Sequence, residues 1–140
     1  MKMSTYINFG GNCAEAFKFY EQNLGGKINM TMLWSQMPGP DAAKHTPPGY
    51  ADKVLHTSME LGGQRLLGAD VPGYQPMRSA YITLNVDSIE EAERIYSTLS
   101  DGGEIYMKMG ETFFAHRFGQ FSDRFGTKWM VICEKPGPQS

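Results

Sequence analysis

The chain has 140 residues, of which 41% are hydrophobic and 20% are charged, and its formal net charge is −2. This composition is typical of a globular domain that buries a core, and the slightly negative charge offers no basic field for nucleic acid. The longest unbroken apolar run, residues 129–133, is too short to span a membrane, and residues 1–12 contain no secretory hydrophobic core. We therefore expect one cytoplasmic domain, residues 1–140, with neither a nucleic-acid partner nor a membrane partner.

The first predicted elements are an apolar strand at residues 6–9 and an amphipathic helix at residues 12–24. Asn12 is positioned to cap this helix, and Glu15, three residues later, to complete a capping box. Gly25-Gly26 ends the helix and leads into a strand at residues 27–34. One helical stripe should face the core, and it consists of Cys13, Ala16, Phe17, Tyr20 and Leu24.

A proline-rich segment follows, residues 35–52, which contains four of the eight prolines of the chain. Proline cannot continue a strand ladder, so this segment is predicted to be a long surface loop of the kind that often forms a lid. Strands are predicted at residues 53–61 and 64–68. Gly62-Gly63 should form the two-residue hairpin turn between them.

The second half repeats the pattern of the first. A strand at residues 81–84 precedes a helix at residues 88–99, in which Ser88 and Glu91 repeat the capping box. An offset of 76 residues aligns Ala16 with Ala92 and Tyr20 with Tyr96. The Gly102-Gly103 exit precedes predicted strands at residues 104–109 and 128–134, and the tail at residues 136–140 should fray. We expect two modules, about residues 1–75 and 76–135, which pair because each repeat covers what the other leaves exposed.

Three segments resemble a known family, the PhnB-like branch of the vicinal oxygen chelate superfamily, which includes glyoxalase I and bleomycin-resistance proteins. They are residues 6–20 (YINFGGNCAEAFKFY), 56–70 (HTSMELGGQRLLGAD) and 111–130 (ETFFAHRFGQFSDRFGTKWM). The resemblance implies an α+β fold of two βαβββ modules that form a half-open curled sheet, and a homodimer. Members of this branch are also labelled 3-demethylubiquinone-9 3-methyltransferase. We do not adopt that activity, because the chain lacks a glycine-rich turn set in repeated βαβ units to bind a nucleotide.

Relatives in this superfamily usually bind a divalent metal through His, Glu or Gln on the first and last strands of each module. Carried over within about one residue, these positions fall on Thr5, Leu67, Tyr81 and Met130. Their side chains do not supply the nitrogen and carboxylate donors that Zn²⁺, Ni²⁺ or Mn²⁺ need. A shift of one residue adds only Tyr6, Asn8 or Glu134. We therefore expect no metal site and no cofactor.

The candidate catalytic residue is His116, a potential general acid or base, with Glu111 as a carboxylate to orient it. Strand alternation places His56 on the face opposite Leu55 and Thr57, so His56 should point into the cleft between the modules. The residues expected to contact a ligand there are His56, Trp34, Tyr81, Met109, Phe113, Phe114, Asp123 and Trp129.

Each of these assignments has a structural alternative. A hydrogen-bonded place in the sheet also explains His56, and a role in anchoring its loop also explains His116. Glu111 and Asp123 are residue types common at solvated surfaces and turns. The aromatic and methionine side chains are common in cores.

The two cysteines should be buried or half-buried free thiols. They form neither a metal-binding spacing nor a disulfide framework. Cys13 follows the predicted cap, where a helix N-terminus favours the thiolate, but its place in the apolar stripe favours the core.

Two classes of function remain. The first is a protein that binds a small, partly apolar molecule in the cleft without the superfamily metal, for which ten adaptable methionines are suitable. The alternative is a metal-dependent or metal-independent lyase, isomerase or oxygenase-type enzyme that uses His116 as acid or base. A noncatalytic interaction protein is a third possibility.

Overall fold

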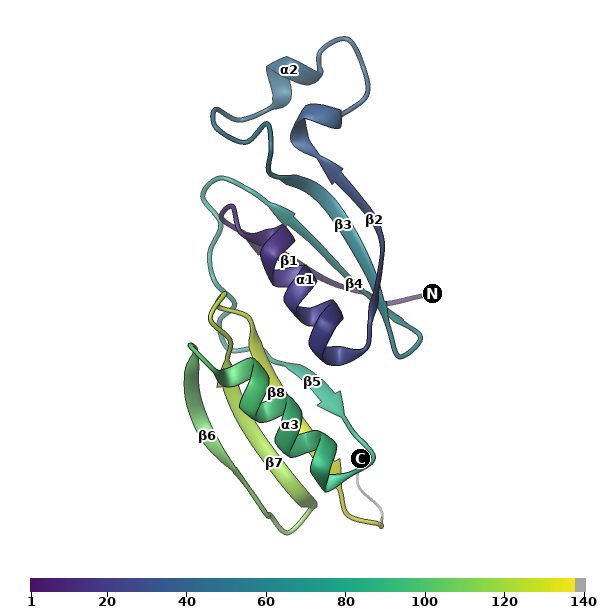
Figure 1. Cartoon of the computed structure of the whole chain (residues 1–140), viewed down its shortest axis with the longest axis vertical. Helices are drawn as coiled ribbons and strands as arrows, with labels where there is room; N and C mark the ends of the chain where they lie inside the picture. Colours follow the sequence, from purple (N-terminus) through teal and green to yellow (C-terminus); the bar gives the residue numbers. More distant parts are fainter. Residues whose placement is uncertain (138–140) are drawn as a thin grey trace. The chain divides into compact units, whose positions relative to one another are not determined.

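The computed structural model describes residues 1–137 and divides into two compact units, residues 1–76 and the residues from Met77 onward. Each unit has its own four-stranded sheet and its own long helix (Figure 1). Of the tail expected to fray, residues 138–140 lie outside the described part. Within residues 1–137, no helix is long and apolar enough to cross a membrane.

The first unit is a βαβββ module in which α1 lies across one face of the sheet (Figure 1). The strand order is β1-β4-β3-β2, with β1 parallel to β4 and the other pairs antiparallel. Its elements are β1 (Thr5–Phe9), α1 (Cys13–Leu24), β2 (Lys27–Leu33), η1 (Trp34–Gln36), α2 (Ala42–His45), β3 (Val54–Leu61) and β4 (Gln64–Asp70).

The second unit has the same topology, with strand order β5-β8-β7-β6 and β5 parallel to β8. Its elements are β5 (Ile82–Asn85), α3 (Ile89–Ser100), β6 (Glu104–Gly110), β7 (Ala115–Ser122) and β8 (Lys128–Glu134). The prediction of an α+β fold with two βαβββ modules is therefore confirmed. The sequence did not predict β7, so placing His116 in a loop was wrong: His116 lies on β7.

Each long helix buries an apolar stripe, and in α1 it is the predicted one. Cys13, Ala16, Phe17 and Tyr20 of α1 are buried, as are Ala92, Ile95 and Leu99 of α3. Each stripe packs on its own sheet, which provides the apolar contact that an amphipathic helix needs for stability.

The helix caps differ between the units. In α3 the Ser88 side chain accepts a hydrogen bond from the backbone N–H of Glu91 at 3.1 Å, as predicted. In α1 the prediction of an Asn12 side-chain cap was wrong. The carboxylate of Asp70, from β4, accepts hydrogen bonds from the backbone N–H groups of Gly11 and Cys13 at 2.8 and 3.0 Å. Because this anionic acceptor already satisfies the donors at the start of α1, the Asn12 side chain does not serve as the helix cap.

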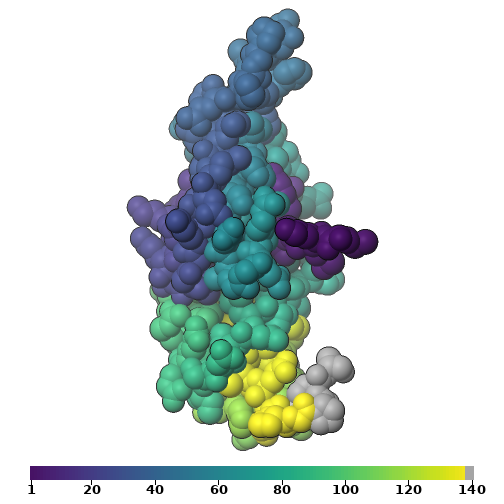
Figure 2. Space-filling model, turned by 90° about the vertical axis from the view of Figure 1, so that its right-hand side faces the viewer, coloured from purple at the N-terminus to yellow at the C-terminus, as the bar shows by residue number. Residues whose placement is uncertain are grey.

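The segment at residues 35–52 lies between β2 and β3 and contains the rest of η1 and the short helix α2. It is held at its base, because the backbone N–H groups of Trp34 and Ser35 donate to the carbonyls of Lys53 and Ala51 at 2.9 and 3.0 Å. In Figure 2 this segment, in blue, extends from the first unit. The predicted loop therefore has local helical structure that its prolines did not indicate.

The predicted hairpin turn is present between β3 and β4. Gly62 and Gly63 have φ values of 58° and 78°. Two successive positive φ values are typical of the type I′ turn, whose twist matches that of the strands that it joins.

Candidate functional site

Each sheet has one face against its helix and one face away from it. In the first sheet the helix-facing side is fixed by Gly68, where a Cβ would lie 2.8 Å from Phe17 Cζ of α1. Gly68 pairs with Ile7 and Thr57, so these residues share its face. The alternating residues face away from the helix. We call this side the first open face, and it bears Tyr6, Asn8, Met30, Met32, His56, Ser58 and Leu67.

A row of paired residues crosses the first open face. Tyr6 pairs with Leu67, Leu67 with Ser58, and Ser58 with Met30. The two ends of the row are accessible, since Tyr6 is 49% and Met30 43% exposed. This open face therefore presents a phenol and a thioether to ligands.

His56 lies beside this row and is bonded to it. Tyr6 Oη lies 3.1 Å from His56 Nδ1, and the two ring centroids are 5.7 Å apart. Partial burial, with a smaller effect from Cys13, raises the pKa of the Tyr6 phenol. His56 pairs across the sheet with Met32 of β2. The expectation that His56 lies on the face opposite Leu55 and Thr57 agrees with this register.

The second sheet has a corresponding open face. A Cβ on Gly119 would lie 3.0 Å from Cδ1 of Tyr96 on α3, so Gly119 faces the helix. The neighbouring row faces away from the helix, and its paired residues are Thr83, Met130, Gln120 and Met107. We call this side the second open face. Its row also ends in a methionine on the outer strand, with Met107 44% exposed.

A cluster of aromatic and cationic side chains lies at one end of this second sheet. The Lys128 ammonium is 4.4 Å from the centroid of the Tyr106 ring and 3.2 Å from its hydroxyl. The rings of Tyr81 and Tyr106 meet edge to face at 6.4 Å. Tyr81, one of the predicted ligand contacts, therefore belongs to a group that includes a cation.

The positions that hold metal in the superfamily do not fit a metal ion here. Leu67 and Met130 lie in the two open-face rows, whereas Thr5 is the first residue of β1 and Tyr81 directly precedes β5. These side chains provide an aliphatic group, a thioether and two hydroxyls, which do not make a site for Zn²⁺, Ni²⁺ or Mn²⁺. Across residues 1–137, no three or more His, Cys, Asp or Glu side chains are grouped so that they could hold a metal ion.

The two predicted catalytic residues are not arranged as a pair. Glu111 Oε2 forms an ion pair with Lys135 Nζ at 2.9 Å. The hydrogen bond from Lys135 and its charge lower the pKa of Glu111, with smaller contributions from Arg117 and His116. The carbonyl oxygen of His116 accepts a hydrogen bond from Arg117 Nη1 at 2.6 Å. The carboxylate proposed to orient His116 is therefore bound to a lysine.

Two predicted ligand contacts are core residues of the second unit. Trp129 is 0% and Asp123 2% exposed, and Trp129 Nε1 donates a hydrogen bond to Asp123 Oδ2 at 2.9 Å. The other oxygen of Asp123 accepts from the backbone N–H groups of Phe125 and Thr127 at 2.9 and 3.0 Å. The geometry therefore supports the structural alternative for both residues, because a buried and hydrogen-bonded side chain has no surface for a ligand.

The remaining predicted contacts are in varied positions. Trp34 Nε1 donates to the carbonyl of Asp70 at 3.0 Å, and the Trp34 ring meets Tyr50 edge to face at 6.5 Å. Phe113 is 91% exposed between β6 and β7, where its ring lies 5.1 Å from that of Phe114. Met109 is half-buried on β6, with its Cα 3.4 Å from the position that a Cβ on Gly119 would occupy.

The ring and cation contacts described above include three residues that were not among the predicted ligand contacts: Tyr6, Tyr106 and Lys128. Tyr6 shares the alternation of the first strand, which was the available signal. Tyr106 lies where the β6–β7 register shifts between Ile105 and Met107, so alternation alone did not assign its face.

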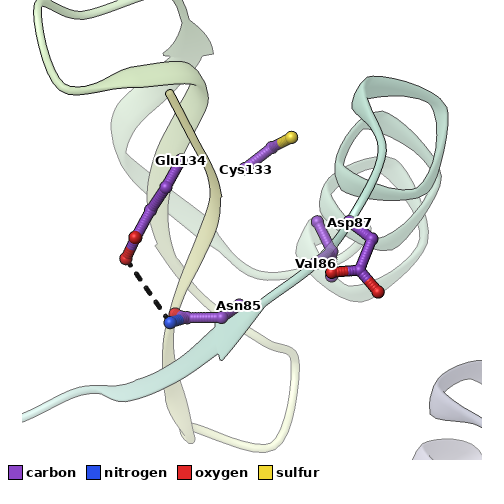
Figure 3. A pocket seen from close by; sticks show the side chains of 5 residues that line it. All are labelled: Asn85, Val86, Asp87, Cys133 and Glu134. Atoms are coloured by element: carbon purple, nitrogen blue, oxygen red, sulfur yellow. Dashed lines mark hydrogen bonds between the residues drawn. The ribbon is translucent and has the colours of Figure 1, made fainter. Parts of the chain in front are cut away.

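A shallow pocket of about 320 Å³ lies elsewhere in the second unit, lined by Asn85, Val86, Asp87, Cys133 and Glu134. Figure 3 shows Asn85 and Glu134 joined by a hydrogen bond of 3.5 Å, with the Cys133 sulfur pointing away from Glu134. None of the predicted site residues lines this pocket.

Comparison with known proteins gives consistent matches over almost the whole chain. A model of the Glyoxalase/Bleomycin resistance protein/Dioxygenase superfamily matches residues 5–131. Protein YjdN from Escherichia coli (strain K12) is 31% identical over 145 residues, which cover 99% of each chain.

Two solved structures share the fold. The crystal structure of protein PA1353 from Pseudomonas aeruginosa has a TM-score of 0.86 at 38% identity and covers 97% of this chain and 99% of that one. The PhnB protein from Bacillus cereus has a TM-score of 0.79 at 22% identity and covers 95% of this chain and 99% of that one. The second likeness shows the fold alone.

Proposed function

The chain belongs to the glyoxalase/bleomycin resistance/dioxygenase superfamily, and from that premise we propose that it binds a small, partly apolar molecule on the open faces of its sheets. The observation that carries the proposal is the composition of these faces. Each has a row of four: a hydroxyl-bearing side chain, an apolar one, a polar one and an exposed methionine. The rows are Tyr6, Leu67, Ser58 and Met30, and Thr83, Met130, Gln120 and Met107.

Exposed thioethers support the binding of apolar molecules. Methionine is flexible and polarisable, so it adapts to ligands of different shape and makes favourable contacts with aromatic rings. Tyrosines on the same faces add flat surfaces with a polar edge. Tyr6, at the end of the row opposite Met30, adds these properties to the first open face, and Tyr106 adds them close to the row of the second.

Binding is a better-supported function than acid–base catalysis at His116. The reaction proposed as the alternative needs a group that orients the imidazole, and Glu111 is instead held by Lys135. The donor set at the superfamily metal positions likewise does not support a metal-dependent version of that reaction.

The proposal is tested with 8-anilinonaphthalene-1-sulfonate and protein labelled with ¹³C at the methionine methyl groups. Ring currents from the probe should shift the methyl signals of Met30, Met32, Met107 or Met130. The signals of buried Met59 and of Met3, outside the sheets, should stay unchanged. Probe-induced shifts confined to Met59 or Met3, or no shifts at millimolar probe, would contradict binding on the open faces.

A matched pair of variants adds an affinity measurement. Met30→Glu places a carboxylate on the first open face, where it repels the sulfonate and removes apolar contact, so probe binding there should weaken about fivefold to thirtyfold, or roughly 1–2 kcal/mol. Met3→Glu makes the same change at a residue that is 90% exposed and lies outside the sheets, and should leave the affinity unchanged.

We also propose that the protein is a homodimer of the cytoplasm. The outer strand β6 supports dimer formation, because Ile105 and Tyr106 on it are 51% and 41% exposed, an unusual solvent exposure for apolar strand residues. Cys13 and Cys133 are both free and buried, which suits a reducing compartment.

A further inference from the structure

Tyr6 and His56 form a hydrogen-bonded pair although they are 50 positions apart in the chain. The pair exists because β1 and β3 both adjoin β4, which brings the first strand close to the third. The planes of the two rings are tilted by 30° to each other, so the hydrogen-bonded rings are also in aromatic contact. The pair is fixed by the sheet rather than by a loop.

The chemistry of the two groups assigns the proton. A phenol is a good donor, and the unprotonated nitrogen of a neutral imidazole is a good acceptor. The raised pKa of Tyr6 keeps the phenol protonated. When Tyr6 Oη–H donates to Nδ1, the imidazole proton is on Nε2, and this N–H is the donor left for another molecule.

Each residue of the pair has an apolar cross-strand partner. Met32 is the cross-strand partner of His56, and Leu67 is the cross-strand partner of Tyr6. A flat apolar molecule on these side chains would be positioned with one edge toward the imidazole. The donor makes the site selective for molecules whose edge carries an acceptor.

The charges on the same face favour an anion. Lys27 pairs with Glu60, and Glu60 pairs with Arg65, which gives one row with two cations and one anion. The strands of the first unit carry one other charged residue, Asp70, whose carboxylate is bound to backbone N–H groups at the start of α1 and β3. The first open face therefore has an excess of positive charge although the whole chain has a net charge of −2.

We propose that the Tyr6–His56 pair is a donor site that selects flat apolar molecules bearing a carboxylate, with His56 Nε2–H as the donor and Tyr6 as the residue that fixes its tautomer. This inference rests on the proposed binding function. It adds the class of ligand and the groups that recognise it.

The test compares two probes that share a naphthalene ring system and carry groups of opposite charge. 2-Naphthoate accepts hydrogen bonds, and 2-naphthylmethylammonium does not. The wild-type protein should bind 2-naphthoate about tenfold to a hundredfold more tightly, a typical effect of a hydrogen bond to a charged group. His56→Phe keeps a flat ring and removes the donor, so it should remove most of this preference and leave only the part that comes from the positive charge on the face. Tyr6→Phe should reduce the ratio about twofold to threefold.

His45→Phe is the matched control, since His45 is an exposed histidine on α2. It should leave the ratio unchanged. If the wild-type protein binds the two probes equally well, and His56→Phe does too, the inference is overturned. The binding function would then still stand. Failure of both probes to bind at millimolar concentration would overturn the inference together with the binding function on this face.

A second measurement needs no ligand. Long-range ¹H–¹⁵N correlations of His56 in the wild-type protein distinguish the two neutral tautomers. The proton should be on Nε2, and the Tyr6→Phe protein should show a mixture of the two tautomers. A proton on Nδ1 in the neutral wild-type protein would overturn the inference even if naphthoate binds.

Discussion

At the scale of single residues, one carboxylate holds together three parts of the first unit. Asp70 accepts hydrogen bonds from the backbone N–H groups of Gly11, Cys13 and Val54, at 2.8, 3.0 and 2.9 Å. These donors belong to the start of α1 and the start of β3. Asp123 has a similar role in the second unit, where its acceptors serve a turn and the Trp129 indole.

Asp70→Asn should destabilise the protein by about 2–4 kcal/mol, because the amide group turns a donor toward backbone donors and the charge-assisted bonds are lost. Urea denaturation measures the change in the free energy of unfolding. Asp41→Asn is the control, since the Asp41 side chain is 62% exposed and should change stability by less than about 0.5 kcal/mol. An Asp70→Asn protein as stable as the control would show that these bonds do not hold α1 and β3.

The same carboxylate adds to the effect of burial on the thiol of Cys13. Burial and the nearby charge of Asp70 raise the pKa of its thiol. A helix N-terminus ordinarily favours a thiolate, and the sequence identified that effect together with the apolar stripe. The stripe indicated correctly that Cys13 is buried, whereas the carboxylate that adds to this effect comes from a residue 57 positions away.

The candidate site was predictable only in part for a similar reason. Alternation along one strand placed His56 on its correct face, because that pattern is local. Its partner Tyr6 depends on the order of the strands in the sheet, which the sequence alone does not give. The aromatic and acidic side chains of the second unit were assigned to a ligand because burial cannot be read from residue type, and Trp129 and Asp123 proved to satisfy each other.

At the scale of secondary structure, the sequence predicted the helices and most of the strands. It missed β7, in which the face toward the helix includes Arg117 and Gly119 instead of an apolar series. Arg117 reaches Glu93 of α3 at 2.9 Å, and Gly119 makes room for Tyr96. Both contacts are with α3, which is distant in the sequence. The pattern of polar and apolar residues along the strand therefore does not reveal them.

Gly68 is the point at which α1 lies closest to its sheet. Gly68→Ala should destabilise the protein by about 1–3 kcal/mol, because the added methyl would lie 2.5 Å from Phe17 Cε1 and 3.2 Å from Cys13 Sγ. Thermal unfolding followed by circular dichroism measures the change.

Gly110→Ala is a suitable comparison for Gly68→Ala. The nearest atom to its added methyl is Lys108 O at 3.9 Å, so its melting temperature should stay near that of the wild type. Equal melting temperatures for the two variants would mean that α1 can move away from the sheet at little cost.

At the scale of the whole molecule, the two units repeat each other in fine detail. An offset of 77 residues relates Tyr6 to Thr83 and Met30 to Met107, which hold equivalent places in the two open-face rows. The register shifts on the outer strands are also equivalent, between Ile28 and Met30 in β2 and between Ile105 and Met107 in β6. The repeat detected in the sequence therefore extends to irregularities that no periodicity predicts.

The proposed homodimer gives a prediction at this scale. Sedimentation velocity at micromolar concentration should show a species of twice the 15.7 kDa chain mass. Ile105→Glu places a charge on the exposed apolar part of β6 and should raise the dissociation constant at least about tenfold. Met3→Glu serves again as the control and should remain dimeric. A wild-type protein that sediments as a monomer at all concentrations would contradict the proposal.

The paired register shifts have a consequence for how the protein behaves when it is crowded. β2 and β6 are the outermost strands of their sheets on one side, and such strands are where foreign chains attach and where fibrils begin to grow. A bulge breaks the even spacing of donors and acceptors that an incoming strand needs. Because the module is present twice, both sheets have this protection against open-ended polymerisation. Each outer strand can therefore carry exposed apolar side chains without pairing with strands of other molecules.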